Sequence, residues 1–287
     1  MRTPPTTIDP DLYRASDPTL AALDDEAAIA HYRAQGRDKG VIASPLALRE
    51  ELVRFIEDDA SVLEIGPYNR PLRHGPRVEY LDVLDAEQLR ARAREQGLDP
   101  AGVPNVIDHV GELDGVDREY DAVLSRHAIE HQPDLVRHLR QIERILKSGG
   151  GYFLIIPDKR YCFDHFIAES TIADILQAHH EGRRSHTLKS LIEHRALTVH
   201  NEHKRHWLGE HGNRLRNRTA RVEAALREYE AANGVYIDVH AWYFTPDSFG
   251  AIVTALRELG LIGLQLAGIY DTARDRNEFC AILKKPG

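Results

Sequence analysis

The sequence of 287 residues has two cysteines, Cys162 and Cys280, which are too few for a disulfide framework. It has no apolar run near the roughly 20 residues that a membrane span requires, and Met1 to Pro5 lack the apolar core of a signal peptide. The formal net charge is -8 and the isoelectric point is about 6.1, so no general attraction to nucleic acid or anionic membranes is expected. We therefore expect a soluble, cytoplasmic protein whose partner is a small molecule.

Glycines are also missing where a dinucleotide-binding protein would need them. An apolar run, Val62 to Ile65, predicts a strand that meets Gly66, but Tyr68 and its neighbours replace the later glycines of a G-x-G-x-x-G turn, which argues against a pyrophosphate. A second run, 78–83, carries Asp82, an acid placed about 20 residues after the first strand, as in nucleoside-binding α/β folds. Such an acid accepts hydrogen bonds from ribose hydroxyls, and a glycine turn lets the backbone approach the ligand.

This first turn resembles that of class I S-adenosylmethionine-dependent methyltransferases, whose first motif reads acid-x-Gly-x-Gly. Glu64-Ile65-Gly66 matches the motif, and Tyr68 stands at the second glycine. An acid before the turn fits poorly beside a polyanion and well beside a ligand that carries an amino group and a sulfonium. The resemblance implies S-adenosylmethionine as the cofactor, with Glu64, Gly66, Pro67 and Asp82 among the residues that bind it.

Two later strand ends extend the resemblance. Residues 105–108 predict a third strand, and in the family an acid at this place and its neighbours bind the adenine amino group, which implies that role for Asp108 and His109. Residues 120–125 predict a fourth strand, and the following Glu130-His131-x-x-Asp134 is similar to the family's segment at this point. Because α/β sheets bind ligands at the carboxyl ends of their strands, Ser125 to His127 should face the ligand, with Ser125 at the cofactor.

Strands and helices alternate along most of the chain. The apolar spacing predicts helices over 45–56, 86–96, 135–146 and 246–259, and strands over 152–156, 264–270 and 279–283. This pattern indicates an α/β fold with a doubly wound seven-stranded sheet, six strands parallel and one antiparallel edge strand. We expect a core of residues 45–157 and 245–287, an N-terminal helical extension over 1–44 that serves as a lid or dimer contact, and a large helical insertion over 158–244.

The insertion follows the fifth strand and holds ten of the sixteen histidines. In the family, insertions at this point commonly build the acceptor pocket. The candidate bases are His127, His165 and His240, because imidazole titrates near the working pH. Asp158 leaves the fifth strand over the expected methyl position and joins them as a candidate catalytic residue.

A hard cation is a further expectation at this end of the sheet. Mg²⁺ held by Asp158, Asp164 or Asp238 would orient vicinal hydroxyls of an acceptor. The spacing of His200, His203 and His206 places them near one stripe of a helix, which indicates a polar surface face or, as the alternative, a set of metal ligands.

The segments at 158–165 and 238–246 look like those of methyltransferases encoded near bacterial glycosyltransferases. The reading is Asp-Lys-Arg-Tyr-x-Phe-Asp-His in the first and Asp-x-His-x-Trp-x-Phe-Thr-Pro in the second. We therefore expect an O-methyltransferase acting on a sugar or oligosaccharide hydroxyl, with Mg²⁺ as an optional aid. An N- or C-methyltransferase of another small metabolite and a non-catalytic partner module of a glycan-assembly complex remain alternatives. A homodimer is the default expectation.

Overall fold

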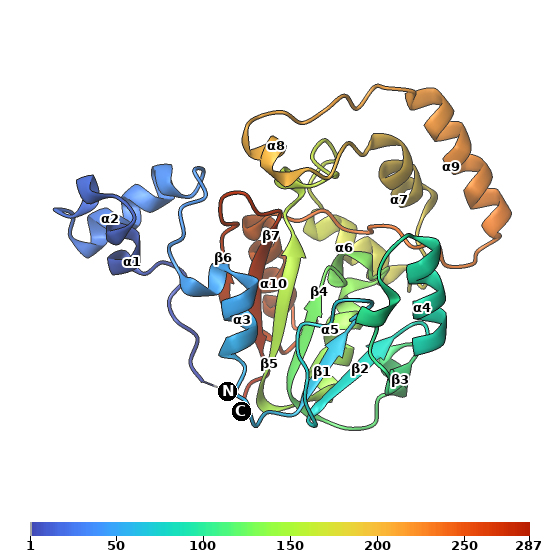
Figure 1. The fold of residues 1–287 in the computed structure, drawn as a ribbon, viewed down its shortest axis with the longest axis horizontal. Coiled ribbons are helices and arrows are strands. Elements are labelled where there is room, and N and C mark those ends of the chain that lie inside the picture. Colours follow the sequence, from blue (N-terminus) through green and yellow to red (C-terminus); the bar gives the residue numbers. More distant parts are fainter. Residues whose placement is uncertain (1) are drawn as a thin grey trace.

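The structure, a computed structural model, describes residues 2–287 and is built around one seven-stranded sheet (Figure 1). The strand order is β3-β2-β1-β4-β5-β7-β6, with six strands parallel and β7 antiparallel, which confirms the predicted fold class. The strands are β1 Val62–Ile65, β2 Val78–Asp82, β3 His109–Val110, β4 Tyr120–Arg126, β5 Leu146–Pro157, β6 Gln265–Tyr270 and β7 Glu278–Lys284.

The sequence predicts an antiparallel strand at the edge of the sheet. In the structure the antiparallel strand, β7, lies inside the sheet. β7 lies between β5 and β6 and pairs with both, for example through Phe153 with Ile282 on the β5 side. A short connection joins antiparallel neighbours readily, so β6 folds back on β7 and becomes the edge. Residues 279–283 of β7 are fully buried, as an inner strand with both faces covered requires.

The third strand is shorter than predicted and begins later, at His109. Residues 105–108 lie outside it, because the carboxylate of Asp108 accepts the backbone N–H of Tyr80 at 2.9 Å and takes the place of a strand partner there. Pairing with β2 starts only at Leu81 with His109 and continues to Asp82 with Val110. The sheet edge therefore ends in a two-residue strand.

Helices cover both faces of the sheet. α5 Leu135–Ile145 and α10 Pro246–Glu258 bury their apolar sides in the larger core, α10 beginning at a Thr245 capping box. α3 Arg49–Phe55 packs on the opposite face, where Leu52 contributes to a second core, and α4 Ala86–Glu95 lies beside β2. The predicted helix at 45–56 is split, since a 3-10 turn over Pro45–Ala47 precedes α3.

The N-terminal extension has a small core of its own and lies beside β6, at the opposite end of the sheet from β3 (Figure 1). It contains α1 Pro10–Ala15 and α2 Asp25–His31, which continues as a π-helical turn over Tyr32–Gly36. Polar contacts hold it to the body: Tyr32 Oη donates to Asp271, and Arg37 bridges Asp271 and Asp247.

The insertion arches over the carboxyl ends of β4 and β5 (Figure 1). It contains α6 Ile172–His180, α7 Leu188–Ile192, α8 His203–Trp207 and α9 Arg218–Ala232. α6 packs against α5 and adds Ile175 and Ala178 to the larger core, so the insertion is anchored in the sheet domain. Within residues 2–287, no helix is both long and apolar enough to cross a membrane.

Candidate active site

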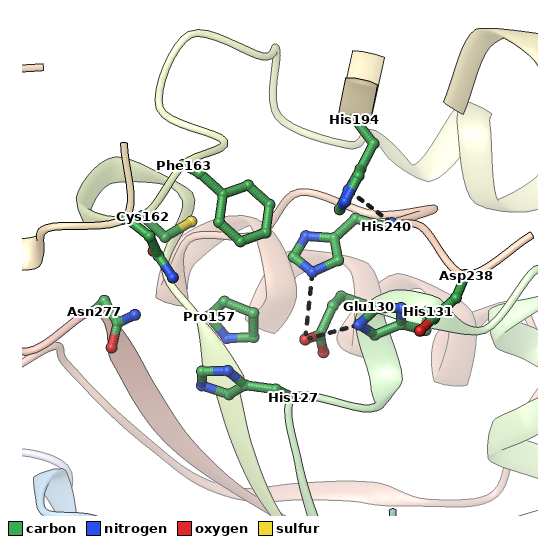
Figure 2. A pocket seen from close by; sticks show the side chains of 11 residues that line it. His127, Glu130, His131, Pro157, Cys162, Phe163, His194, Asp238, His240 and Asn277 are labelled. Carbon is green, nitrogen blue, oxygen red and sulfur yellow. Dashed lines mark hydrogen bonds and ion pairs between the residues drawn. The ribbon is translucent and has the colours of Figure 1, made fainter. Parts of the chain in front are cut away.

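A cavity of about 270 Å³ lies where the insertion meets the carboxyl ends of β4 and β5 (Figure 2). Its walls come from four parts of the chain: the segment after β4, the end of β5, the insertion and the turn before β7. The lining residues are His127, Glu130, His131, Pro157, Cys162, Phe163, His194, Asn201, Asp238, His240 and Asn277. Two of the four predicted catalytic residues, His127 and His240, therefore share one cavity.

His127 follows β4 directly and has a strained backbone. Its φ is 49°, a left-handed value that is uncommon for a residue other than glycine and that often marks functional sites. Its Nε2 lies 2.9 Å from Oε2 of the buried Glu278, and Arg49 contacts the same carboxylate at 2.6 Å. Burial alone would raise the pKa of the Glu278 carboxyl. The hydrogen bond with His127 and the charge of Arg49 outweigh burial, so the pKa of Glu278 is lowered. His127 is therefore held by a carboxylate that stays charged.

A second group of buried side chains surrounds Glu130. His240 Nδ1 lies 2.6 Å from Asp164 Oδ2, and its Nε2 lies 3.8 Å from Glu130 Oε1. His131 stands edge-on to His240, with ring centroids 4.7 Å apart, and its Nε2 also lies 3.8 Å from Glu130 Oε1. His194 completes this group, and its Nδ1 accepts the backbone N–H of His240. Burial lowers the pKa of His194 to about 4, so its ring is neutral at pH 7.

The three aspartates expected to hold Mg²⁺ do not converge. Asp158 is fully buried, and its oxygens accept hydrogen bonds from the Arg160 side chain and from Thr272 Oγ1. Asp164 is directed at His240, while Asp238 contacts Arg92 at 2.8 Å and His131 at 2.9 Å. The three aspartates therefore do not come together as one metal site in this structure, and the pairing of the Asp158 carboxylate favours a structural role over that of a base.

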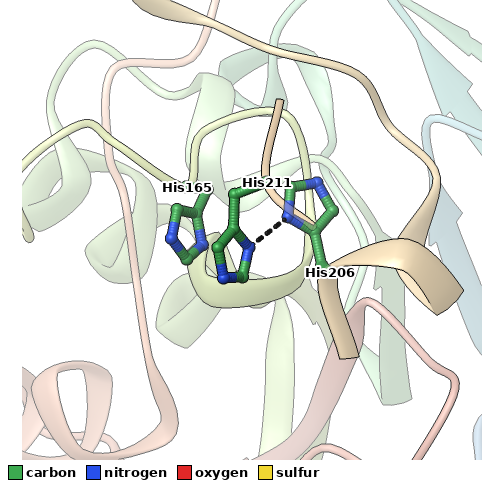
Figure 3. A group of neighbouring side chains, drawn as sticks. All are labelled: His165, His206 and His211. Atoms are coloured by element: carbon green, nitrogen blue, oxygen red, sulfur yellow. Dashed lines mark hydrogen bonds between the residues drawn. The ribbon is translucent and has the colours of Figure 1, made fainter. Parts of the chain in front are cut away.

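His165 lies outside the cavity, in a stack of histidines within the insertion (Figure 3). Its ring is parallel to that of His211, with centroids 3.6 Å apart and planes 7° apart, and His206 lies next to His211. Its Nδ1 is 2.7 Å from the carbonyl oxygen of Arg160. Nitrogen lone pairs lie in the ring plane, so parallel rings do not aim them at one ion. The position of His165 gives no support to its expected role as a base.

The turn after β1 has the backbone that its sequence requires. Gly66 has a φ of 67°, and Tyr68, which stands at the motif's second glycine, has a φ of 44°. A left-handed conformation at both positions explains why glycine is usual there and why tyrosine is tolerated only with strain. Pro67 is buried between them. The turn therefore keeps a left-handed backbone at both glycine positions of the motif, although tyrosine stands at the second.

Two acids flank this turn, and they differ in what they contact. Glu64 is buried and accepts the backbone N–H groups of Leu72 (2.8 Å) and Arg73 (3.1 Å), so it fixes the rest of the loop. Burial raises its pKa to about 7. Asp82 ends β2, next to β1, and Leu84 N–H approaches its Oδ1 at 3.4 Å. Burial also raises the pKa of Asp82. The contacts of Glu64 make it an anchor of the loop, whereas Asp82 stands at the end of β2.

The remaining predicted cofactor residues serve the sheet itself. Asp108 accepts Tyr80 N–H at mid-strand, and His109 Nε2 lies 2.9 Å from Glu79 and 3.0 Å from Tyr120 Oη, toward the amino-terminal half of the sheet. Ser125 Oγ is buried against Tyr152 Oη at 2.8 Å. These contacts therefore give no support to the adenine-binding role expected for Asp108 and His109. They also give none to the cofactor contact expected for the Ser125 side chain.

Sequence reasoning missed Glu130, His131 and His194 as site residues. The segment that contains Glu130 and His131 was recognised as similar to the family, and its place after a strand end was a usable signal. His194 gave no signal beyond the density of histidines in the insertion. Its position beside His240 depends on the fold of residues 193–240, which no local pattern encodes.

A family model described as "Methyltransferase domain" matches residues 37–253. No curated protein matches the chain. Similar solved structures include a Listeria monocytogenes protein assigned as an S-adenosylmethionine-dependent methyltransferase, with 14% identity, a TM-score of 0.41, and coverage of 83% of this chain and 97% of that one.

Two further similar structures match this chain over only about half of their own length. The amino pentose methyltransferase CalS10 from Micromonospora echinaspora is 22% identical over 44% of this chain and 54% of its own, with a TM-score of 0.29. A Nostoc punctiforme protein assigned as an O-methyltransferase is 15% identical over 82% of this chain and 55% of its own, with a TM-score of 0.36. The chain thus spans about half the length of each of these two proteins.

Proposed function

Because the chain belongs to the methyltransferase-domain family and is an S-adenosylmethionine-dependent methyltransferase, we propose that it methylates a hydroxyl group of a small acceptor held in the cavity. The cofactor would lie over the ends of β1 and β2, with Gly66 giving close backbone approach and Asp82 accepting the ribose hydroxyls. This fit is supported by the positive φ of Gly66 and by the place of Asp82 at the end of the neighbouring strand. When bound, the cofactor supplies a methyl group already activated by the sulfonium.

The observation that carries the proposal is the His127–Glu278 pair. An alcohol has a high pKa, so its methylation needs a group that removes or polarises the proton. Glu278 accepts the Nε2 proton of His127, which leaves Nδ1 with a lone pair at the end of β4, in the wall of the cavity. The same carboxylate stabilises the imidazolium that forms when Nδ1 takes up the proton.

The polarity of the cavity supports a polyhydroxylated acceptor such as a sugar or oligosaccharide. Asn201 and Asn277 offer amide groups, and Phe163 adds an apolar surface beside them. Such a mixture of hydrogen-bonding groups with one aromatic face suits a ring that carries several hydroxyls. An amine acceptor needs no base when it binds unprotonated, so the histidine–carboxylate pair favours the hydroxyl.

The experiment measures labelled methyl transfer from S-adenosylmethionine to a panel of sugars, phenols and amines. With the best acceptor, Glu278→Gln should lower kcat by about 10²–10⁴, because a glutamine amide facing His127 Nε2 would leave the proton on Nδ1. The KM for the cofactor should stay within a few-fold. Asp247→Asn, which removes an exposed carboxylate paired with Arg37, is the control. A Glu278→Gln enzyme with kcat within threefold of wild type, or transfer to amines alone, contradicts the proposal.

A further inference from the structure

The carboxylate of Glu130 is buried without a partner. Its residue is 1% exposed, and within residues 2–287 neither oxygen has a hydrogen bond. An isolated carboxylate in such a place is costly unless a positive charge or a set of donors compensates it. Glu130 lies in a one-turn 3-10 helix, Ile129–His131, that follows β4 at the cavity wall, so the compensating group should be sought in the cavity.

Two imidazole nitrogens face this carboxylate at a distance that no direct bond explains. His131 Nε2 and His240 Nε2 each lie 3.8 Å from Glu130 Oε1, which is too long for a hydrogen bond. The rings are nearly perpendicular, at 87°, so their in-plane lone pairs approach from different directions. The three ligand atoms all lie within 4.8 Å of one another.

The far sides of both rings are turned to carboxylates. His240 Nδ1 is hydrogen-bonded to Asp164 Oδ2 at 2.6 Å, and His131 Nδ1 lies 2.9 Å from Asp238 Oδ1 as an ion-pair contact without hydrogen-bond geometry. A proton on each Nδ1 leaves each Nε2 as an acceptor. Two lone pairs and one carboxylate then point at the same space, an arrangement of acceptors alone that a cation would satisfy. Carboxylates behind the distal nitrogens are the usual outer support of metal-binding histidines.

We propose that Glu130, His131 and His240 bind one divalent transition-metal ion at the cavity wall. Two imidazoles and one carboxylate suit Zn²⁺, Mn²⁺ or Fe²⁺ and leave further coordination positions open toward the cavity. The nitrogen ligands distinguish this site from the all-oxygen Mg²⁺ site that the sequence predicts at Asp158, Asp164 and Asp238. Those three aspartates do not come together in the structure. Bonds of about 2.0–2.2 Å would draw the ligand atoms together by on the order of half an ångström.

An open position on such an ion would polarise the acceptor hydroxyl and lower its pKa. This catalytic role rests on the proposed function, but the binding of the ion does not. In this arrangement His240 is a ligand and His127 remains the base, so the two histidines that share the cavity have different tasks.

The test measures metal content by mass spectrometry on untagged protein purified without chelator from cells grown with Zn²⁺, Mn²⁺ and Fe²⁺. We expect about one ion per chain in the wild type and at least a fivefold loss in Glu130→Gln and His240→Ala. The matched control is the double variant His206→Ala/His211→Ala, which removes imidazoles from the separate histidine stack and should keep the ion. Binding of S-adenosylhomocysteine verifies that each variant is folded.

Cobalt provides a second readout that needs no acceptor. Co²⁺ added to chelator-stripped wild type should give a visible absorption band that saturates at one equivalent, and His240→Ala should weaken it. Wild type that holds no ion and gives no band overturns the site and leaves a protonated His131 as the cation beside Glu130. Metal that is retained in Glu130→Gln and His240→Ala but lost in the stack variant also overturns it. Wild type that holds the ion but transfers no methyl group to a hydroxyl acceptor would instead count against the proposed function.

Discussion

Asp158 is the first residue after β5, and substituting it distinguishes a structural role from a catalytic one. Its carboxylate is fully buried and accepts hydrogen bonds from Arg160 N, from Arg160 Nε and Nη2, and from Thr272 Oγ1. Asp158→Asn would remove the charge and place amide protons opposite these donors. We expect this variant to be destabilised and to keep its affinity for S-adenosylhomocysteine.

The size of the effect follows from the burial of the pair. Breaking a buried ion pair by removing one partner costs about 3–5 kcal/mol. The Arg160 side chain is 31% exposed and can regain some hydration, so the lower end, about 3 kcal/mol, is expected. For a chain of this size that corresponds to a fall in Tm of about 6–12 °C. Urea unfolding followed by circular dichroism measures the change in the free energy of unfolding.

The control is Asp247→Asn, in which the lost carboxylate is 76% exposed and pairs with Arg37 at the surface. Exposed pairs contribute about 0–1 kcal/mol, so this variant should unfold close to wild type. If Asp158→Asn unfolds within 0.5 kcal/mol of wild type and yet loses methyl transfer, the structural role is refuted and Asp158 belongs to the reaction.

Two further predictions concern stability. Burial lowers the pKa of His138 to about 3, so below pH 6.5 the unfolded chain takes up a proton that the folded one does not, and at pH 5 this should remove about 2 kcal/mol of unfolding free energy. Urea titrations at pH 5 and 8 should show this fall in unfolding free energy in wild type and not in His138→Gln. An equal fall in both proteins would contradict the role of His138. Gly66→Ala should cost about 1–2 kcal/mol because φ is 67° there, whereas Gly115→Ala, with open space around it, should change little. Equal effects of the two glycine variants would refute the strain.

Local patterns in the sequence predicted the elements well, because apolar spacing and capping residues act over a few positions. The runs at 62–65 and 279–283 are strands, and Thr245 begins a helix as its type suggested. The place of β7 between β5 and β6 was not predictable in this way, since it depends on which distant edge the hairpin joins.

The site was harder to predict than the sheet for the same reason. His127 and His240 were identified by residue type and by their positions near strand ends. The partner of each, Glu278 and Asp164, comes from a segment 151 or 76 residues away. Asp108 is the opposite case, because an acid at a predicted strand end has the same sequence signal whether it meets a ligand or the N–H of Tyr80.

The most direct test of the proposed cofactor position over β1 and β2 is calorimetry of S-adenosylhomocysteine with wild type and Asp82→Ala. The wild type should bind one molecule per chain, and loss of the carboxylate should weaken binding by at least tenfold, since a hydrogen bond to a charged group contributes about 1.5–3 kcal/mol. Absence of binding to the wild type, or equal affinity in Asp82→Ala, would contradict the placement of the cofactor over β1 and β2.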